Sequence, residues 1–242
     1  MEDLEYFFEM VVFIASCFFL YKFFRRWYSP LGAWPDEKNR LAKTILGWLP
    51  IAFLGLVLFT LFNLASFDVV DSPFYILFYI LLGYAWMYGG LLLVSICFDL
   101  HWFDDAVYLN NKAAMAAIIG EFFVLALIYA GSNIGDGPGW WCVIFAGSLG
   151  LITWIILGFI IHYFTGIFEK ITVDRDLGSG IRFLIYSMAS GFFLGNACSG
   201  DWTSFSATVV EFAVGWPVLP LTAVMIFLEL LFKPHVNTRN NW

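Results

Sequence analysis

The residues of this chain that could carry chemistry are ionisable side chains inside long apolar stretches. Glu121 is the deepest acid among them. It lies about two turns into the apolar stretch 113–131, roughly 12 Å from the basic end of that stretch at 1.5 Å per residue. An ionisable group at that depth in a membrane is costly, and so is a functional candidate by default. Glu121 is therefore expected either to bind a cation or relay a proton, or to be a structural group, protonated or paired with Arg182 or Lys112.

Three other polar residues join Glu121 in a candidate polar site within the membrane. Arg182 begins the next-to-last apolar stretch, where its head can reach lipid phosphate or Asp176. Asn133 and Asn196 both lie near the outer ends of their stretches, where amide side chains can hydrogen-bond between helices. We therefore predict a candidate site made of Glu121, Asn133, Asn196 and Arg182.

Groupings typical of enzymes and cofactor sites are missing from the sequence. The three histidines are far apart, the four cysteines occur singly, and neither a nucleophile elbow nor a phosphate loop is present. The acidic group beside Trp102 and Phe103 is explained more simply as the start of an interfacial helix than as a metal site. We therefore predict that the protein is not an enzyme and has no catalytic residue, cofactor or metal. A disulfide between Cys142 and Cys198 remains open, because both lie near the same membrane face.

Membrane-spanning helices must position these polar residues. The chain is 61% hydrophobic and 13% charged, whereas about a quarter of the residues of a typical soluble domain are charged. An apolar helix of about 20 residues spans a bilayer. The predicted fold class is an all-α polytopic membrane protein with seven transmembrane helices. The seven stretches are about 6–24, 45–65, 74–98, 113–131, 140–163, 178–198 and 215–232.

The basic residues assign an orientation to these helices. When the loops are assigned alternately to the two sides, all 12 lysines and arginines fall on one side. Basic residues mark the cytoplasmic side of short loops. The N-terminus is therefore predicted outside and the C-terminus inside. The first residues, MEDLEYFFE, lack the basic region of a signal peptide, so the first stretch is expected to be retained.

Two connections carry signals of their own. The cytoplasmic connection 25–44 contains the turn formers Pro30, Gly32 and Pro35, and Trp27 is expected there as an interfacial anchor. The outer connection 199–217 is predicted to form an amphipathic helix, either seated in lipid or docking a partner. Its large apolar residues recur every three or four positions: Trp202, Phe205, Val209, Phe212 and Trp216.

The chain repeats a unit of two helices. A shift of 65 residues aligns 74–136 with 139–201 without a gap and places Asn111 on Asp176. Because each unit contains two spans, both units enter the membrane in the same direction, and the repeat is parallel, about an axis near the membrane normal. The predicted divisions are an N-terminal two-span extension (1–73), repeat 1 (74–138), repeat 2 (139–201), and the outer helix, last span and cytoplasmic tail (202–242).

Two segments of the repeats carry a family resemblance. LNNKAAMAAIIG (109–120) and SGFFLGNACSGDW (190–202) resemble the YjfL-like bacterial inner-membrane proteins, a two-repeat family of unknown function. In that family a polar Asn or Asp turn opens an Ala/Gly-rich helix once per repeat. The resemblance covers about 74–201, and Arg182 and the aromatic-rich N-terminal extension depart from it. It implies a bacterial inner membrane and no established activity.

The stretch 178–198 has a face suited to close packing. Ser187, Gly191, Gly195 and Ser199 recur every four residues, so a neighbouring backbone can approach this face. Ala126 and Ala130 occupy the equivalent face of the stretch 113–131. We predict that these two helices form the central pair of the bundle.

Two classes of function follow from these patterns. The favoured one is a non-catalytic subunit or scaffold of a membrane assembly, which packs with lipids and with other membrane subunits or further copies of itself. No nucleic acid is expected as a partner. The alternative is a small ion channel or transporter that uses Glu121 and a path between the repeats. A water-accessible cavity that reaches Glu121 favours transport, whereas a sealed dry core favours the subunit.

Overall fold

The computed structural model describes residues 2–33, 40–137, 139–201 and 203–232, and its regular secondary structure in these ranges is helical. Six of the described helices are long and apolar enough to cross a membrane. This confirms the predicted all-α class, with long apolar helices that could cross a membrane. The six are α1 (Glu2–Ala33), α2 (Arg40–Asn63), α4 (Pro73–Phe98), α5 (Lys112–Ser132), α6 (Trp140–Thr165) and α8 (Leu177–Cys198).

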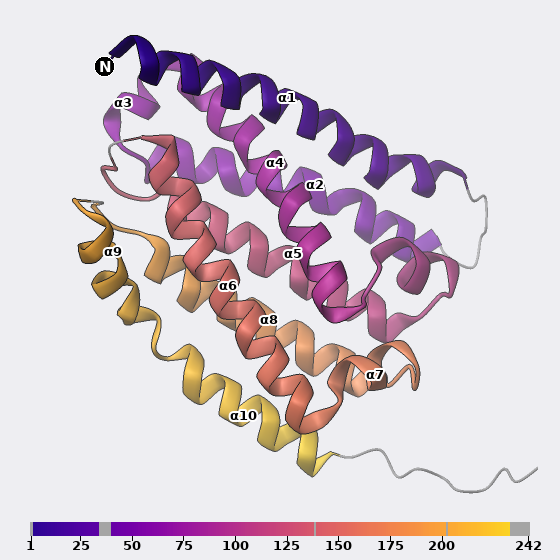
Figure 1. The fold of residues 1–242 in the computed structure, drawn as a ribbon. Helices are drawn as coiled ribbons and strands as arrows, with labels where there is room; N and C mark the ends of the chain where they lie inside the picture. Colours follow the sequence, from indigo (N-terminus) through magenta and orange to yellow (C-terminus); the bar gives the residue numbers. More distant parts are fainter. Residues whose placement is uncertain (1, 34–39, 138, 202, 233–242) are drawn as a thin grey trace, which may run out of the picture.

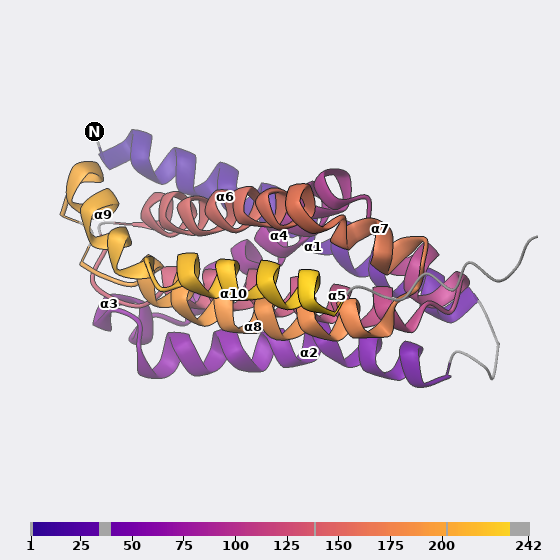
Figure 2. The ribbon, with the colours of Figure 1, turned by 90° about the horizontal axis from the view of Figure 1, so that it is seen from below.

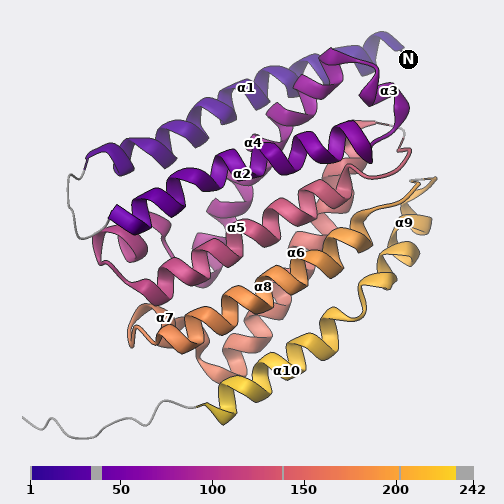
Figure 3. The same cartoon turned by 180° about the vertical axis from the view of Figure 1, so that it is seen from behind.

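The long helices lie side by side and run lengthwise between the two ends of the bundle, with α4 and α6 inclined to the others (Figures 1 and 3). In one layer α2, α5, α8 and α10 (Val218–Leu231) follow one another, and α1, α4 and α6 form the other layer (Figure 2). The most extensive contact between described helices joins α5 to α8. These two helices therefore form the centre of the bundle.

The short helices cap the two ends of the bundle. Near the start of α1 lie α3 (Phe67–Val70) and α9 (Phe205–Phe212) (Figure 1). At the other end lie the π-helix η2 (Trp102–Tyr108) and α7 (Ile167–Thr172). All lysines and arginines of the described chain lie toward this second end, which we call the basic end. They are Lys22, Arg25, Arg26, Arg40, Lys43, Lys112, Lys170, Arg175 and Arg182. Lys38, Lys233 and Arg239 lie outside the described residues.

The first helix is longer than its apolar stretch predicts. It continues through Pro30 and ends at Ala33, so the expected turn at Pro30 and Gly32 is wrong. Pro35 lies outside the described residues. Trp27 is also not an exposed anchor: it is 2% exposed, and its indole Nε1 donates a hydrogen bond to the carbonyl of Leu46, 2.9 Å away. This hydrogen bond, together with packing against the rings of Phe23, Trp102 and Phe122, accounts for the burial of Trp27.

The last span is shorter than predicted. Helix α10 has 14 residues, which span about 21 Å, less than the ~30 Å of a bilayer core. It follows α9 and the short 3₁₀ turn η3 (Ala213–Gly215) at a bend of 41°, and counting this bent pair as one span gives seven. The predicted helix in 199–217 is present as α9, whose Phe205 ring packs against Trp141 and Phe145 of α6.

The connections before α5 and α8 have the same local hydrogen bonds. Asn111 caps α5 by accepting from the N–H groups of Ala113 and Ala114, and Asp176 caps α8 by accepting from those of Gly178 and Ser179. The residues just before the caps, Asn110 and Arg175, both have left-handed backbones, with φ of 50° and 55°. Two backbone hydrogen bonds before α5 also recur before α8, 65 residues later. The Leu109 N–H donates to the Asp104 carbonyl, as the Asp174 N–H does to that of Glu169. The Asn111 N–H donates to the Asp105 carbonyl, as the Asp176 N–H does to that of Lys170.

Candidate functional site

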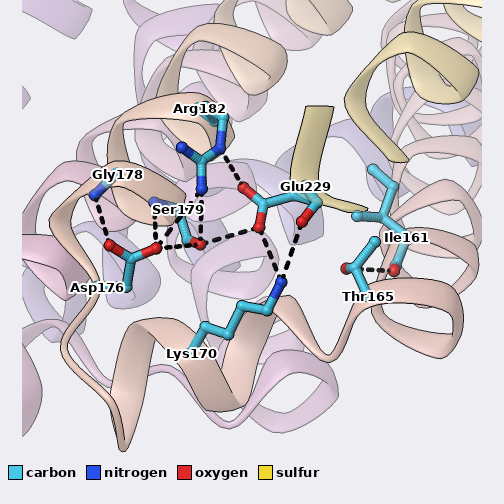
Figure 4. A network of polar contacts seen from close by, with 8 residues as sticks. All are labelled: Ile161, Thr165, Lys170, Asp176, Gly178, Ser179, Arg182 and Glu229. Atoms are coloured by element: carbon cyan, nitrogen blue, oxygen red, sulfur yellow. Dashed lines mark hydrogen bonds and ion pairs between the residues drawn. The ribbon is translucent and has the colours of Figure 1, made fainter. Parts of the chain in front are cut away.

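Among the described residues, the largest group of charged contacts surrounds Glu229 at the basic end (Figure 4). The Glu229 side chain is 0% exposed, although it lies in the last turn of an apolar helix. Lys170 of α7 places its Nζ 3.1 Å from Glu229 Oε2, and Arg182 of α8 donates from Nε to Oε1. The Ser179 hydroxyl oxygen lies 2.9 Å from Oε2 and 2.7 Å from Oδ2 of Asp176, so its one proton is shared between two carboxylates. Three elements thus meet at one buried carboxylate.

Arg182 connects this carboxylate to a second one. Its Nη2 lies 3.5 Å from Oδ2 of Asp176 and donates to the Ser179 hydroxyl at 3.1 Å. The guanidinium carbon also lies 5.6 Å from the ring centre of Phe232. The predicted contact with Asp176 is therefore present, and Arg182 has Glu229 as a further partner.

Asp176 is both a helix cap and part of the charged group. Burial by itself raises the pKa of this carboxyl, but the Ser179 hydroxyl, the N–H groups of Ser179 and Gly178, and Arg182 together hold the pKa below its ordinary value. Asp176 is therefore ionised at neutral pH. With Glu229 it balances the two cations Lys170 and Arg182.

This arrangement favours a structural lock over a reactive centre. A buried carboxylate is tolerated when it is paired and hydrogen-bonded, and Glu229 has both kinds of partner. The contacts fasten α10 to α7 and α8. The pairing of Glu229 with Arg182 is not visible in the sequence, because 47 residues separate them and no local spacing joins them. The available signal was an acid in the last turn of an apolar stretch that ends on the basic side.

Glu121 does not belong to this group. It is 2% exposed in α5, and its Oε1 atom has no hydrogen-bond partner. The ion pairs of the described residues join neither Arg182 nor Lys112 to it, so the predicted structural pairing is wrong. Arg182 lies in the first turns of α8 and reaches Glu229 and Asp176 instead.

The two asparagines of the candidate site do not join α5 to α8. Asn133 donates from Nδ2 to the Tyr129 carbonyl of its own helix, at 2.7 Å. Asn196 has an exposed side chain. The expected hydrogen bond between helices is therefore wrong, because the end of α5 satisfies its own carbonyls with Asn133. The four predicted residues Glu121, Asn133, Asn196 and Arg182 are thus not brought together into one site.

The predicted small-residue face lies at the contact between α5 and α8. A Cβ added at Gly195 would lie 2.6 Å from the Leu127 carbonyl oxygen, and one at Gly191 would lie 2.9 Å from Cα of Val124. Gly131 meets the Gly195 backbone even more closely. The remaining members are Ala126, Ala130 and Ser187, which are buried, and Ser199, which follows the last residue of α8, is partly buried and donates to the Asn196 carbonyl.

Two cavities lie near the basic end, and Glu121 lines neither of them. One, of about 230 Å³, is formed by α1, α4 and the residues around η2. The other, of about 110 Å³, lies between α8 and α10 beside Arg182. In η2, burial raises the pKa of Asp105 above its ordinary value, and the hydrogen bond from the His101 N–H offsets only part of this rise.

The cysteines form no cross-link in the structure. Cys142 and Cys198 are buried free thiols, and Cys198 donates to the Ala146 carbonyl at 3.1 Å. Within the described ranges, no group of three or more His, Cys, Asp or Glu residues is arranged to hold a metal ion.

Comparison with known proteins leaves the family open. No family model matches the chain, and no match was found among curated proteins or among solved structures. The resemblance to the YjfL-like family therefore remains a prediction.

Proposed function

We propose that this chain is a multi-pass protein of a bacterial inner membrane and serves as a non-catalytic subunit or scaffold of a membrane assembly. The observation that carries this proposal is the tight centre of the bundle. The backbones of α5 and α8 touch at Gly131 and Gly195, which leaves no space for a solute between them there. A centre closed by backbone contact favours packing as the role of the two repeats.

The surface of the bundle supports the same role. Helix α1 is the least buried of the six candidate spans, and α5 is the most buried. Exposed aromatic and aliphatic residues such as Phe18, Tyr21 and Phe227 cover the outer helices α1 and α10. An apolar surface of this kind needs lipid or another membrane helix against it.

The charge distribution supports an orientation. Because basic residues favour the cytoplasmic side, the basic end is proposed to face the cytoplasm. Exposed Thr203 and Val173 lie at opposite ends and are suitable for cysteine labelling after Cys17→Ser. Thr203→Cys should react with an impermeant reagent in intact cells, and Val173→Cys only after lysis. The reverse pattern would refute the orientation.

The corresponding hydrogen bonds before α5 and α8 support a parallel repeat over 74–138 and 139–201. These hydrogen bonds recur 65 residues apart, which is the shift that aligns the two units in the sequence. A repeat whose polar turns open two small-residue helices also fits the proposed YjfL-like resemblance.

Particle composition tests the subunit proposal. The tagged chain would be extracted from bacterial membranes directly into polymer nanodiscs, and the protein mass and stoichiometry of the particles measured. We expect further copies or a second membrane protein at a fixed ratio. Particles that contain one chain and only lipid would overturn the proposal.

A small channel or transporter is the second candidate, and one observation favours it. Glu121 is buried with an unpartnered Oε1, as expected for a carboxyl that meets a cation or proton only during transport. Ion flux into liposomes that contain the purified protein distinguishes the two roles. Flux that depends on Glu121 would replace the subunit proposal.

A further inference from the structure

The cavity of about 230 Å³ at the basic end combines apolar walls with charges of both signs. Helix α1 contributes Arg26, and the segment around η2 contributes Asp104. Both side chains are exposed, and among the described residues neither forms an ion pair. A cation and an anion on one cavity, each without a described partner, fit a ligand that itself carries both charges.

The base of this cavity is held in place by aromatic contacts. Trp27 and Trp102 both line it, and their rings are stacked with centres 4.5 Å apart. The hydrogen bond from Trp27 to Leu46 fixes one ring. The Asp105 carboxylate accepts the His101 N–H at 2.8 Å and so fixes the start of η2. The cavity is therefore formed by the fold itself and needs no ligand to shape it.

The position of the cavity matches the depth of lipid headgroups. Arg26 lies in the last part of α1, and η2 connects the end of α4 to the start of α5. Leu91 and Leu92 of α4 extend the lining toward the apolar part of the bundle. The cavity thus has polar groups at the end of two spans and leucines closer to the middle of the bundle. A membrane lipid changes in the same order, from its polar headgroup to its acyl chains.

We propose that this cavity binds a glycerophospholipid whose headgroup carries a phosphate and a primary ammonium, as phosphatidylethanolamine does. The Arg26 guanidinium binds the phosphate, because its fork of donors matches two phosphate oxygens. The Asp104 carboxylate binds the ammonium, and Leu91 and Leu92 contact the first part of an acyl chain. The inference rests on the membrane placement in the proposed function, and not on the subunit role.

Native mass spectrometry of the delipidated protein tests this site. Binding would be compared for phosphatidylethanolamine, phosphatidylcholine and phosphatidylglycerol. Arg26→Gln should weaken phosphatidylethanolamine binding by about tenfold or more, because it removes charge-assisted hydrogen bonds to the phosphate. Asp104→Asn should remove the preference for phosphatidylethanolamine over phosphatidylcholine. Arg25→Gln and Asp99→Asn are matched controls, since neither residue lines the cavity, and both should bind as wild type does.

Two further arms keep the test decisive. Ser95 lines the cavity, so Ser95→Phe should block binding without changing a charge. If Arg26→Gln does not fold, this variant decides the result. Free phosphoethanolamine should not compete with the lipid, and equal competition would mean a soluble ligand instead.

The proposal is overturned if the three lipids bind equally, or if Ser95→Phe binds phosphatidylethanolamine as wild type does. The subunit role is tested by a different measurement, the stoichiometry of the nanodisc particles, so its failure can be distinguished from failure of the lipid site. A protein that binds this lipid but forms no assembly would keep the site and lose only that role.

Discussion

Two carboxylates in apolar helices have opposite surroundings in this molecule. Glu229 and Glu121 are both buried, yet Glu229 contacts two cations and a hydroxyl, whereas Oε1 of Glu121 has no partner. The difference follows from position along the bundle. Glu229 lies in the last turn of α10 beside the basic end, but Glu121 lies deeper in α5. Burial alone therefore does not reveal whether an acid in a membrane helix is structural.

The two helix caps show a milder form of the same contrast. Asn111 is neutral and buried, and donates from Nδ2 to the Ile171 carbonyl at 2.7 Å. Asp176 is charged and lies beside Arg182. The turn before α5 is thus capped by a neutral side chain, whereas the equivalent turn before α8 is capped by a carboxylate that also pairs with Arg182.

Removing the charge of Glu229 should have the largest effect. Glu229→Gln leaves Lys170 and Arg182 with one less counter-charge in a largely buried place. Breaking one side of a buried ion pair costs about 3–5 kcal/mol. We expect the free energy of unfolding to fall by that amount in detergent denaturation. A loss below about 1 kcal/mol would mean that this group resembles a surface ion pair.

Adding a methyl group at the centre of the bundle should have the next largest effect. Gly195→Ala forces apart the backbones of α5 and α8, which are in contact there, and overpacking of this kind costs about 1–3 kcal/mol. Gly89→Ala is the matched control, because a Cβ there meets nothing within 4 Å. Equal unfolding free energies for the two variants would mean that α5 and α8 separate easily.

Comparing the two caps in acid should give a smaller difference. Loss of an N-cap side chain costs about 1 kcal/mol, so Asn111→Ala and Asp176→Ala should be similarly destabilised at neutral pH. The pKa of Asp176 is lower in the folded protein than in the unfolded chain. The charge of Asp176 therefore stabilises the fold fully at pH values above the ordinary aspartate pKa of about 3.9.

This stabilisation is lost as pH falls through the folded pKa. Asp176→Ala should therefore approach wild-type stability below about pH 4, whereas Asn111→Ala should not. Thermal unfolding of both variants across pH 3–7 measures this difference. Parallel pH profiles for the two variants would contradict it.

Replacing Glu121 should change stability least. Glu121→Gln is nearly isosteric and removes an ionisable group without breaking a described ion pair. We expect the unfolding free energy to stay the same or to rise by less than about 1 kcal/mol. Flux in liposomes would be measured on the same samples. Wild-type flux that disappears in a stable Glu121→Gln protein would make Glu121 the functional acid.

Much of the fold was predictable because long apolar helices are encoded locally. Apolar length identified the regions of the spans, and polar turns at Asn111 and Asp176 marked where α5 and α8 begin. The ends of α1 and α10 were predicted poorly. Pro30 lies within α1, where the sequence signal indicated a turn, and α10 is shorter than its apolar stretch.

The candidate site was harder to predict than the fold. Side-chain type and depth identified Glu121 and Arg182 as unusual, but they did not identify their partners. Asn133 bonds within its own helix, and Arg182 bonds a glutamate from the last helix. Pairings between distant segments depend on which helices become neighbours, and a single sequence does not report that.

The sequence by itself determined the helical class, the apolar regions and the concentration of positive charge at one end, because each depends on local composition and length. Only the tertiary structure decided which polar groups meet. Packing of α8 against α10 buries Glu229 beneath two cations, while packing around α5 leaves Oε1 of Glu121 without a partner. Ion pairs act over a few ångströms, and chain folding alone brings residues from distant helices within that range.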